Sequence, residues 1–210
     1  MTGFIKKDLL LVKANFKMLM VFTIVFVILA ITGAFDLTFV LPFLSIMVFV
    51  TTFSYDDYNG WNAYAVSMPA GRKICIKGKY VASVILIILL TLISMIITYL
   101  VHLINGDNMS LLELSFPAAI SVLSVSLTVS LMYPVIIKFG STNGRIWLFV
   151  IIFIIIGGLG LLSNYVDLSF LDDGMRFFEK NLLWVVPVVS ALMMLISYFI
   201  SEKIFKNKEF

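Results

Sequence analysis

The sequence predicts an all-α membrane protein with six transmembrane helices and both termini in the cytoplasm. Six apolar stretches are each long enough to cross the ~30 Å hydrocarbon core of a bilayer as a helix of about 20 residues. Hydrophobic residues make up 61% of the 210 residues and charged residues 13%, and the mean hydropathy is +1.10, which excludes an ordinary soluble domain. Because these runs are continuous, they do not show the alternating pattern of a transmembrane β-strand. The stretches cover residues 18–34, 37–53, 80–104, 114–137, 146–163 and 182–201.

The distribution of positive charge predicts the orientation of these helices. All Lys and Arg residues except Arg176 and Lys180 lie before the first stretch, between the second and third, around the turn between the fourth and fifth, or after the last. The glycines and polar residues of 139–144 predict a loop at that turn. Since Lys and Arg of short loops stay on the cytoplasmic side, this pattern predicts a multi-pass protein of the cell membrane with cytoplasmic termini. The long charged lead-in and the long first apolar run argue against a cleaved signal peptide.

The segment before the first stretch, residues 2–17, has a helical pattern of its own. Ile5, Leu9, Val12 and Phe16 recur at spacings of three and four residues, which places them on one helical face. The lysines of this segment occupy other faces. We therefore expect an amphipathic helix that lies in the cytoplasmic interface, and the alternative is a simple positively charged flank.

The segment 55–69, between the second and third stretches, is the strongest candidate for a binding element. Asp56 and Asp57 suit the N-terminus of a helix because acidic residues there face the positive end of the helix dipole. Aromatic residues follow at helical spacing, and Pro69 is expected to end the helix. An exposed aromatic and basic helix predicts docking to a partner, whereas an aromatic belt at the membrane surface is the structural alternative. The candidate docking residues are Asp56, Asp57, Tyr58, Trp61, Tyr64, Ala65, Met68, Pro69, Arg72 and Lys73.

Polar residues within the predicted spans are few and uncharged at the span centres. The absence of central Lys, Arg, Asp and Glu argues against ion-coupled transport and against charged selectivity rings. Ser121, Ser124 and Thr128 share one face of the fourth span, which predicts either part of a translocation path or contacts between helices. The outer segment 164–181 mixes acidic and apolar residues and is either a short amphipathic helix dipping into the outer leaflet or a structured loop.

Residues for catalysis or for cofactor binding are lacking. The chain has one cysteine, Cys75, and one histidine, His102, which excludes an internal disulfide and multi-histidine metal sites. The Gly-rich stretch 71–80 has six residues between its glycines and a Tyr after the Lys, so it does not fit a phosphate-binding loop. We expect no enzyme activity and no cofactor in this chain. A membrane-embedded enzyme without a recognisable motif and a stand-alone immunity or scaffold protein remain as alternatives to a transporter.

The arrangement resembles the permease subunits of ABC-2 type transporters, especially the short Gram-positive kind similar to permeases of phenol-soluble-modulin and antimicrobial-peptide exporters. The resemblance rests on Phe-Ile-Lys-Lys-Asp-Leu at 4–9, on the block 53–69 with the basic pair that follows it, and on the six-span layout. It covers essentially the whole chain, and the block 53–69 is its most specific part.

The resemblance implies a single permease domain over residues 1–210. Residues 2–17 would be the connecting helix, 55–69 the coupling helix that docks on an ATP-binding subunit, and 164–181 a re-entrant segment. Two permeases, identical or different, would pair with two ATP-binding subunits that hold ATP and Mg. The cargo would be hydrophobic or amphipathic (a peptide toxin, an antimicrobial peptide or a lipid-like molecule), with membrane lipids and no nucleic acid among the partners. Cargo identity and transport direction stay open.

Overall fold

The computed structural model describes residues 2–14, 16–31, 37–68, 71–105, 111–162 and 170–208. Within these ranges every regular element is a helix, and the prediction of an all-α protein is confirmed. The helices are α1 (Thr2–Ala14), α2 (Phe16–Ile31), α3 (Leu37–Tyr58), α4 (Trp61–Ser67), α5 (Gly71–Asn105), α6 (Leu111–Leu162) and α7 (Phe170–Lys206).

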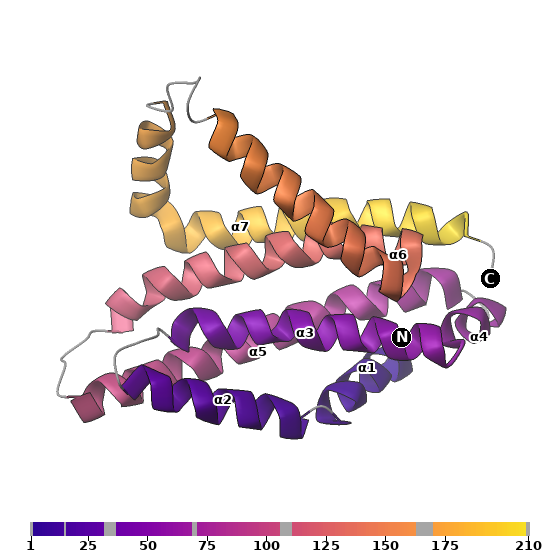
Figure 1. Ribbon diagram of the computed structural model, residues 1–210, viewed down its shortest axis with the longest axis horizontal. Coiled ribbons are helices and arrows are strands. Elements are labelled where there is room, and N and C mark those ends of the chain that lie inside the picture. Colours follow the sequence, from indigo (N-terminus) through magenta and orange to yellow (C-terminus); the bar gives the residue numbers. More distant parts are fainter. Residues whose placement is uncertain are drawn as a thin grey trace.

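The long helices form an elongated bundle (Figure 1). Helix α3 packs against α5 and α6, and α6 packs against α7. The short helices α1 and α4 lie at one end of the bundle, together with the C-terminal end of α7. We call this the α4 end. The core runs along the bundle axis and is built from α3, α5, α6 and α7.

Among the described residues, four helical segments are long and apolar enough to cross a membrane. Helix α2 adds a shorter apolar segment, Leu19–Ile31. Helix α6 continues to Leu162 and so covers most of the predicted fifth span, although most side chains there lie outside the described residues. Residues 164–169 of the predicted segment 164–181 are likewise outside the described residues, and none of the side chains of that segment is described. The four long segments are Leu37–Tyr58, Gly71–Asn105, Glu113–Gly144 and Trp184–Lys206.

Helix α5 shows how these segments are built for lipid. Its polar side chains Ser83, Ser94 and Thr98 are buried against neighbouring helices. The opposite face exposes large apolar side chains, for example Leu92 at 56% and Ile96 at 61%. A helix in water would be arranged the other way round. This inverted distribution indicates a multi-pass membrane protein, because hydrocarbon takes up the apolar face that water would not.

The structure divides the segment that was predicted as one helix over 55–69. Helix α3 continues through Tyr58, the chain turns at Gly60 with a φ of 63°, and α4 begins only at Trp61. The placement of Asp56 and Asp57 at a helix N-terminus is therefore wrong, since both lie in the last turn of α3. The physical reason is the left-handed conformation at position 60, which glycine adopts without steric cost. Helix α5 also begins earlier than the predicted span at 80.

The predicted loop at 139–144 is a sharp break within α6. Gly140 has φ 82° and ψ 168°, and helical structure resumes immediately after it. In Figure 1 the two parts of α6 run in clearly different directions from this point. Gly144 lies so close to the preceding part that an added Cβ would be 2.9 Å from the Cα of Ile136. Glycine at both positions allows the chain to reverse within a few residues.

Candidate functional site

Helix α4 is fixed to the start of α5 by a backbone contact without intervening side chains. A Cβ added to Gly71 would lie 1.7 Å from the carbonyl oxygen of Ala65, and Ala65 itself is fully buried. Met68 ends α4 in an extended conformation with φ −80° and ψ 149°, as expected for a residue before proline. Pro69 lies outside the described residues. Helix α4 is therefore held closely against α5.

The predicted aromatic face is split between two directions. Trp61 is half-buried and faces α1, with its ring 5.9 Å from the ring of Phe4 and 4.7 Å from the Lys7 ammonium. Tyr58 is 89% exposed and Tyr64 is 58% exposed. Of the aromatic residues predicted to dock, Tyr58 and Tyr64 therefore face outward, while Trp61 packs between α4 and α1.

A cluster of two aspartates and two lysines lies behind α4 and joins α1, α3 and α5. Asp56 accepts hydrogen bonds from Lys7 and Lys79, one on each carboxylate oxygen. The Oδ1 atom of Asp8 lies 3.1 Å from the Lys7 nitrogen and 3.9 Å from that of Lys79. Lys79 also sits over the ring of Phe53, 4.3 Å from its centroid. Asp8, Asp56 and Lys79 are all buried, so their charges are balanced within the protein, as buried charges require.

Sequence patterns alone did not predict this ion cluster, although one indication was present. Asp8 falls on the same helical face as Ile5, Leu9 and Val12, where an acid is out of place. A charged residue on an otherwise apolar face requires a partner of opposite charge if that face is buried. Lys79, directly before the apolar run of α5, is one of the partners that the fold supplies.

Asp57, the neighbour of Asp56, contacts a different pair of elements. Its Oδ1 accepts a hydrogen bond from Asn62 Nδ2 at 3.0 Å, and its Oδ2 accepts one from the backbone N–H of Ser141 at 2.7 Å. Tyr58 and Thr142 lie beside it along an open groove of about 580 Å³. The remaining lining residues of this groove are Thr51, Ser54 and Tyr55. The groove therefore combines hydroxyl groups, aromatic rings and a carboxylate next to α4.

The predicted basic residues after α4 have different environments. Arg72 is half-buried and donates a hydrogen bond to the carbonyl oxygen of Lys206, which ties the start of α5 to the end of α7. Lys73 is exposed. Of this pair, Lys73 is the one that presents its charge at the surface of the α4 end.

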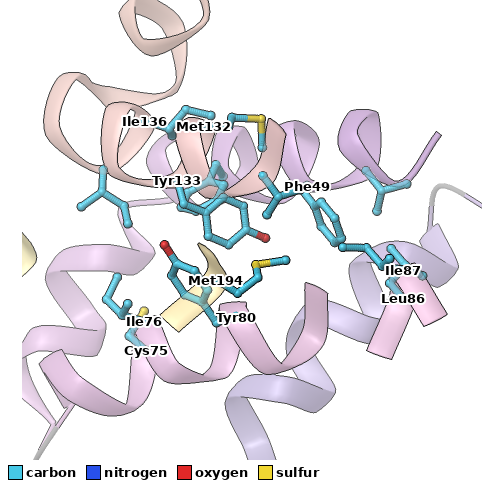
Figure 2. Packing of buried hydrophobic residues seen from close by; sticks show 14 of the residues in the cluster. Phe49, Cys75, Ile76, Tyr80, Leu86, Ile87, Met132, Tyr133, Ile136 and Met194 are labelled. Carbon is cyan, nitrogen blue, oxygen red and sulfur yellow. The ribbon is translucent and has the colours of Figure 1, made fainter. Parts of the chain in front are cut away.

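Hydrogen-bonded hydroxyl groups lie inside the bundle around Tyr80 and Tyr133, whose side chains Figure 2 shows within the core. Tyr80 of α5 and Tyr133 of α6 face one another, with ring centroids 4.9 Å apart. The Tyr80 hydroxyl is hydrogen-bonded to Ser197 at 2.6 Å and to Ser201 at 2.8 Å, and Tyr133 is hydrogen-bonded to Ser83. These contacts connect α5, α6 and α7 just inside the α4 end.

The residues predicted to line a translocation path are bonded to their own helix. Ser121 is fully buried and donates to the carbonyl oxygen of Ala118 at 2.7 Å. Ser124 and Thr128 are half-buried and donate to backbone carbonyls one turn earlier, both at 2.9 Å. Their role in a path stays a prediction.

Among the residues that the structure describes, no group of three or more His, Cys, Asp or Glu side chains is placed to hold a metal ion.

A comparison with protein families finds a match over residues 3–206 to a model described as an ABC-2 family transporter protein. No curated protein and no solved structure matches the chain.

Proposed function

This chain belongs to the ABC-2 family of transporter proteins, and we propose that it is the permease subunit of an ATP-driven exporter of a hydrophobic or amphipathic substrate. Members of this family are membrane components of transport, are not themselves catalytic, and normally work with an ATP-binding subunit. In our proposal the α4 end faces the cytoplasm, six helices cross the membrane, and two permeases pair with two ATP-binding subunits that hold ATP and Mg.

The observation that supports docking at this end is the combination of exposed aromatic residues with the anchoring of α4. Tyr58, the last residue of α3, and Tyr64 of α4 project outward at 89% and 58% exposure, and aromatic residues are enriched among those that dominate binding energy in interfaces. Helix α4 is fixed to α5 through the close contact of Ala65 and Gly71. A partner that binds the tyrosines therefore acts on a rigid extension of the membrane-spanning helices.

The experiment begins with mild-detergent purification of the chain from its native membrane. Mass spectrometry of the eluate should show a protein with a phosphate-binding loop in stoichiometric amount. Tyr58→Ala and Tyr64→Ala should each lose most of that protein, because a truncated interface anchor typically costs ~2 kcal/mol or more, about a thirtyfold loss of affinity. The two variants should insert into the membrane and resist heating like the wild type, since both side chains are exposed.

Trp184→Ala is a matched control. Trp184 is also an exposed aromatic, at 82%, but it lies 22 residues before the end of α7 at Lys206, about 33 Å along a helix. This variant should keep the ATP-binding protein. Retention of that protein by both tyrosine variants would remove α4 from the docking surface, and its absence from the wild-type eluate would contradict the permease proposal as a whole.

A further inference from the structure

The break in α6 leaves two backbone groups without their helical partners, and side chains from elsewhere occupy both. In an unbroken helix the N–H of Ser141 would bond to the carbonyl oxygen of Ile137, four residues earlier. At Gly140 the chain leaves the helical conformation. The N–H of Ser141 instead donates to Asp57, and the carbonyl of Ile137 accepts a hydrogen bond from Lys208 Nζ at 2.8 Å.

Asp57 thus caps the part of α6 that begins at Ser141. A carboxylate at the start of a helix satisfies a free N–H and lies at the positive end of the helix dipole. This cap comes from α3 rather than from the residue preceding the helix. The other oxygen of the same carboxylate holds Asn62, in the first turn of α4. One side chain therefore joins α3, α4 and the second part of α6.

We propose that Asp57 is the positioning residue through which displacement of α4 reaches the part of α6 beyond Gly140. The inference rests on the proposed function, in which an ATP-binding subunit moves α4. The backbone contact of Ala65 with Gly71 transmits such a movement to α5. The carboxylate of Asp57 transmits it to α6, because both of its hydrogen bonds are charge-assisted and of normal length.

This hydrogen-bond pattern allows a test in which the side chains of Asp57 and Asn62 are exchanged. Asp57→Ala removes both acceptor oxygens, whereas Asn at 57 would keep both bonds because the Asn62 amide can turn to accept from it. Asn62→Asp alone places a second carboxylate opposite Asp57 and removes the donor. In the double variant, Asn at 57 accepts from Ser141 and donates to Asp at 62, which restores both hydrogen bonds with unchanged net charge.

The readout is the distance between α4 and α6 in the purified permease, measured by pulsed electron paramagnetic resonance. Spin labels are placed on Ala63→Cys and Asn143→Cys, both exposed positions, while the native Cys75 is buried. The labelled parent should give one narrow distance distribution. Asp57→Ala and Asn62→Asp should each broaden it, and the double variant Asp57→Asn with Asn62→Asp should recover the narrow form. Asn59→Asp adds the same negative charge as Asn62→Asp, at an exposed position between α3 and α4. This control should leave the distance distribution unchanged.

The same labels then report transmission in the complex with the ATP-binding subunit, trapped with ATP and vanadate. In the labelled parent and the double variant the α4–α6 distance should stay as it is in the nucleotide-free complex, because the two elements move together. In Asp57→Ala it should shift, as measured in the fraction that retains the ATP-binding subunit.

A narrow distribution in Asp57→Ala, or no recovery in the double variant relative to Asn62→Asp, would overturn the link itself. An unshifted distance in the trapped Asp57→Ala complex would overturn transmission. If no ATP-binding subunit associates with the parent, the proposed function fails, and the measurement on the permease alone still decides whether Asp57 joins the two helices.

Discussion

Replacement of Asp56 by Asn removes the central carboxylate of the buried ion cluster while keeping its shape. Asp56 is 3% exposed and contacts Lys7 and Lys79. Without its charge, Lys79, which is 4% exposed, retains Asp8 at 3.9 Å as its nearest carboxylate. The variant therefore leaves two lysines with one carboxylate, Asp8, which lies 3.1 Å from the Lys7 nitrogen but 3.9 Å from that of the buried Lys79.

The size of the effect follows from the partners that remain. Breaking a buried ion pair by removing one partner costs about 3–5 kcal/mol. The low end applies here, because Asp8 and the ring of Phe53, 4.3 Å from the Lys79 nitrogen, still compensate part of the charge. A loss of about 3 kcal/mol corresponds to a midpoint lowered by roughly 6–12 °C for a chain of this size.

The assay is heating of the purified permease in detergent, followed by size-exclusion chromatography of the fraction that stays monodisperse. Glu113→Gln removes the same charge at an exposed position and should stay near the wild-type midpoint. Asp56→Asn combined with Lys79→Met should recover part of the loss, because Lys7 and Asp8 then remain as a neutral pair 3.1 Å apart. The reasoning is refuted if Asp56→Asn is as stable as Glu113→Gln, or if the double variant is less stable than Asp56→Asn.

Two further substitutions test the packing on either side of this cluster. Gly71→Ala should destabilise the α4–α5 contact by about 1–3 kcal/mol, since its Cβ would lie 1.7 Å from the Ala65 carbonyl oxygen. The control in the same heating assay is Gly3→Ala, where nothing lies within 4 Å of the added Cβ. Tyr80→Phe should lower stability by about 1–2 kcal/mol, because the hydroxyl bonded to Ser197 and Ser201 is lost; an unchanged midpoint would show that the two serines find other partners.

The apolar pattern was sufficient to predict the helical class and the positions of most membrane-crossing segments. Continuous apolar runs determine these features locally, because a lipid-embedded backbone must satisfy its hydrogen bonds within the segment. The boundaries were harder to predict where helix continues past the apolar run. Helix α5 starts at Gly71, ahead of the predicted span, because the segment 71–80, although it carries four basic residues, packs against α1, α4 and α7. Such contacts are tertiary and leave no period in the sequence.

The segment that forms the candidate site was predicted from the sequence, but the directions of its side chains were not, because these also depend on tertiary contacts. The aromatic spacing identified the segment around α4, but it did not show that Trp61 turns inward to Phe4 while Tyr58 and Tyr64 remain exposed. Which aromatic faces outward depends on where α1 packs. Likewise, the glycines at 140 and 144 indicated a turn, yet only the fold shows that Asp57 caps the helix after it.

Asp56 and Asp57 are adjacent in the last turn of α3, and their side chains point in different directions. Consecutive helical residues point about 100° apart, so Asp56 and Asp57 do not converge on one reacting atom as a catalytic pair must. The same angle directs one carboxylate to α1 and α5 and the other to α4 and α6. The last turn of α3 is therefore a junction that holds four other helices through two side chains. In the proposed coupling, a movement applied at α4 reaches the second part of α6 through Asp57, which is why exchange of the Asp57 and Asn62 side chains tests that route more directly than a substitution within the spans.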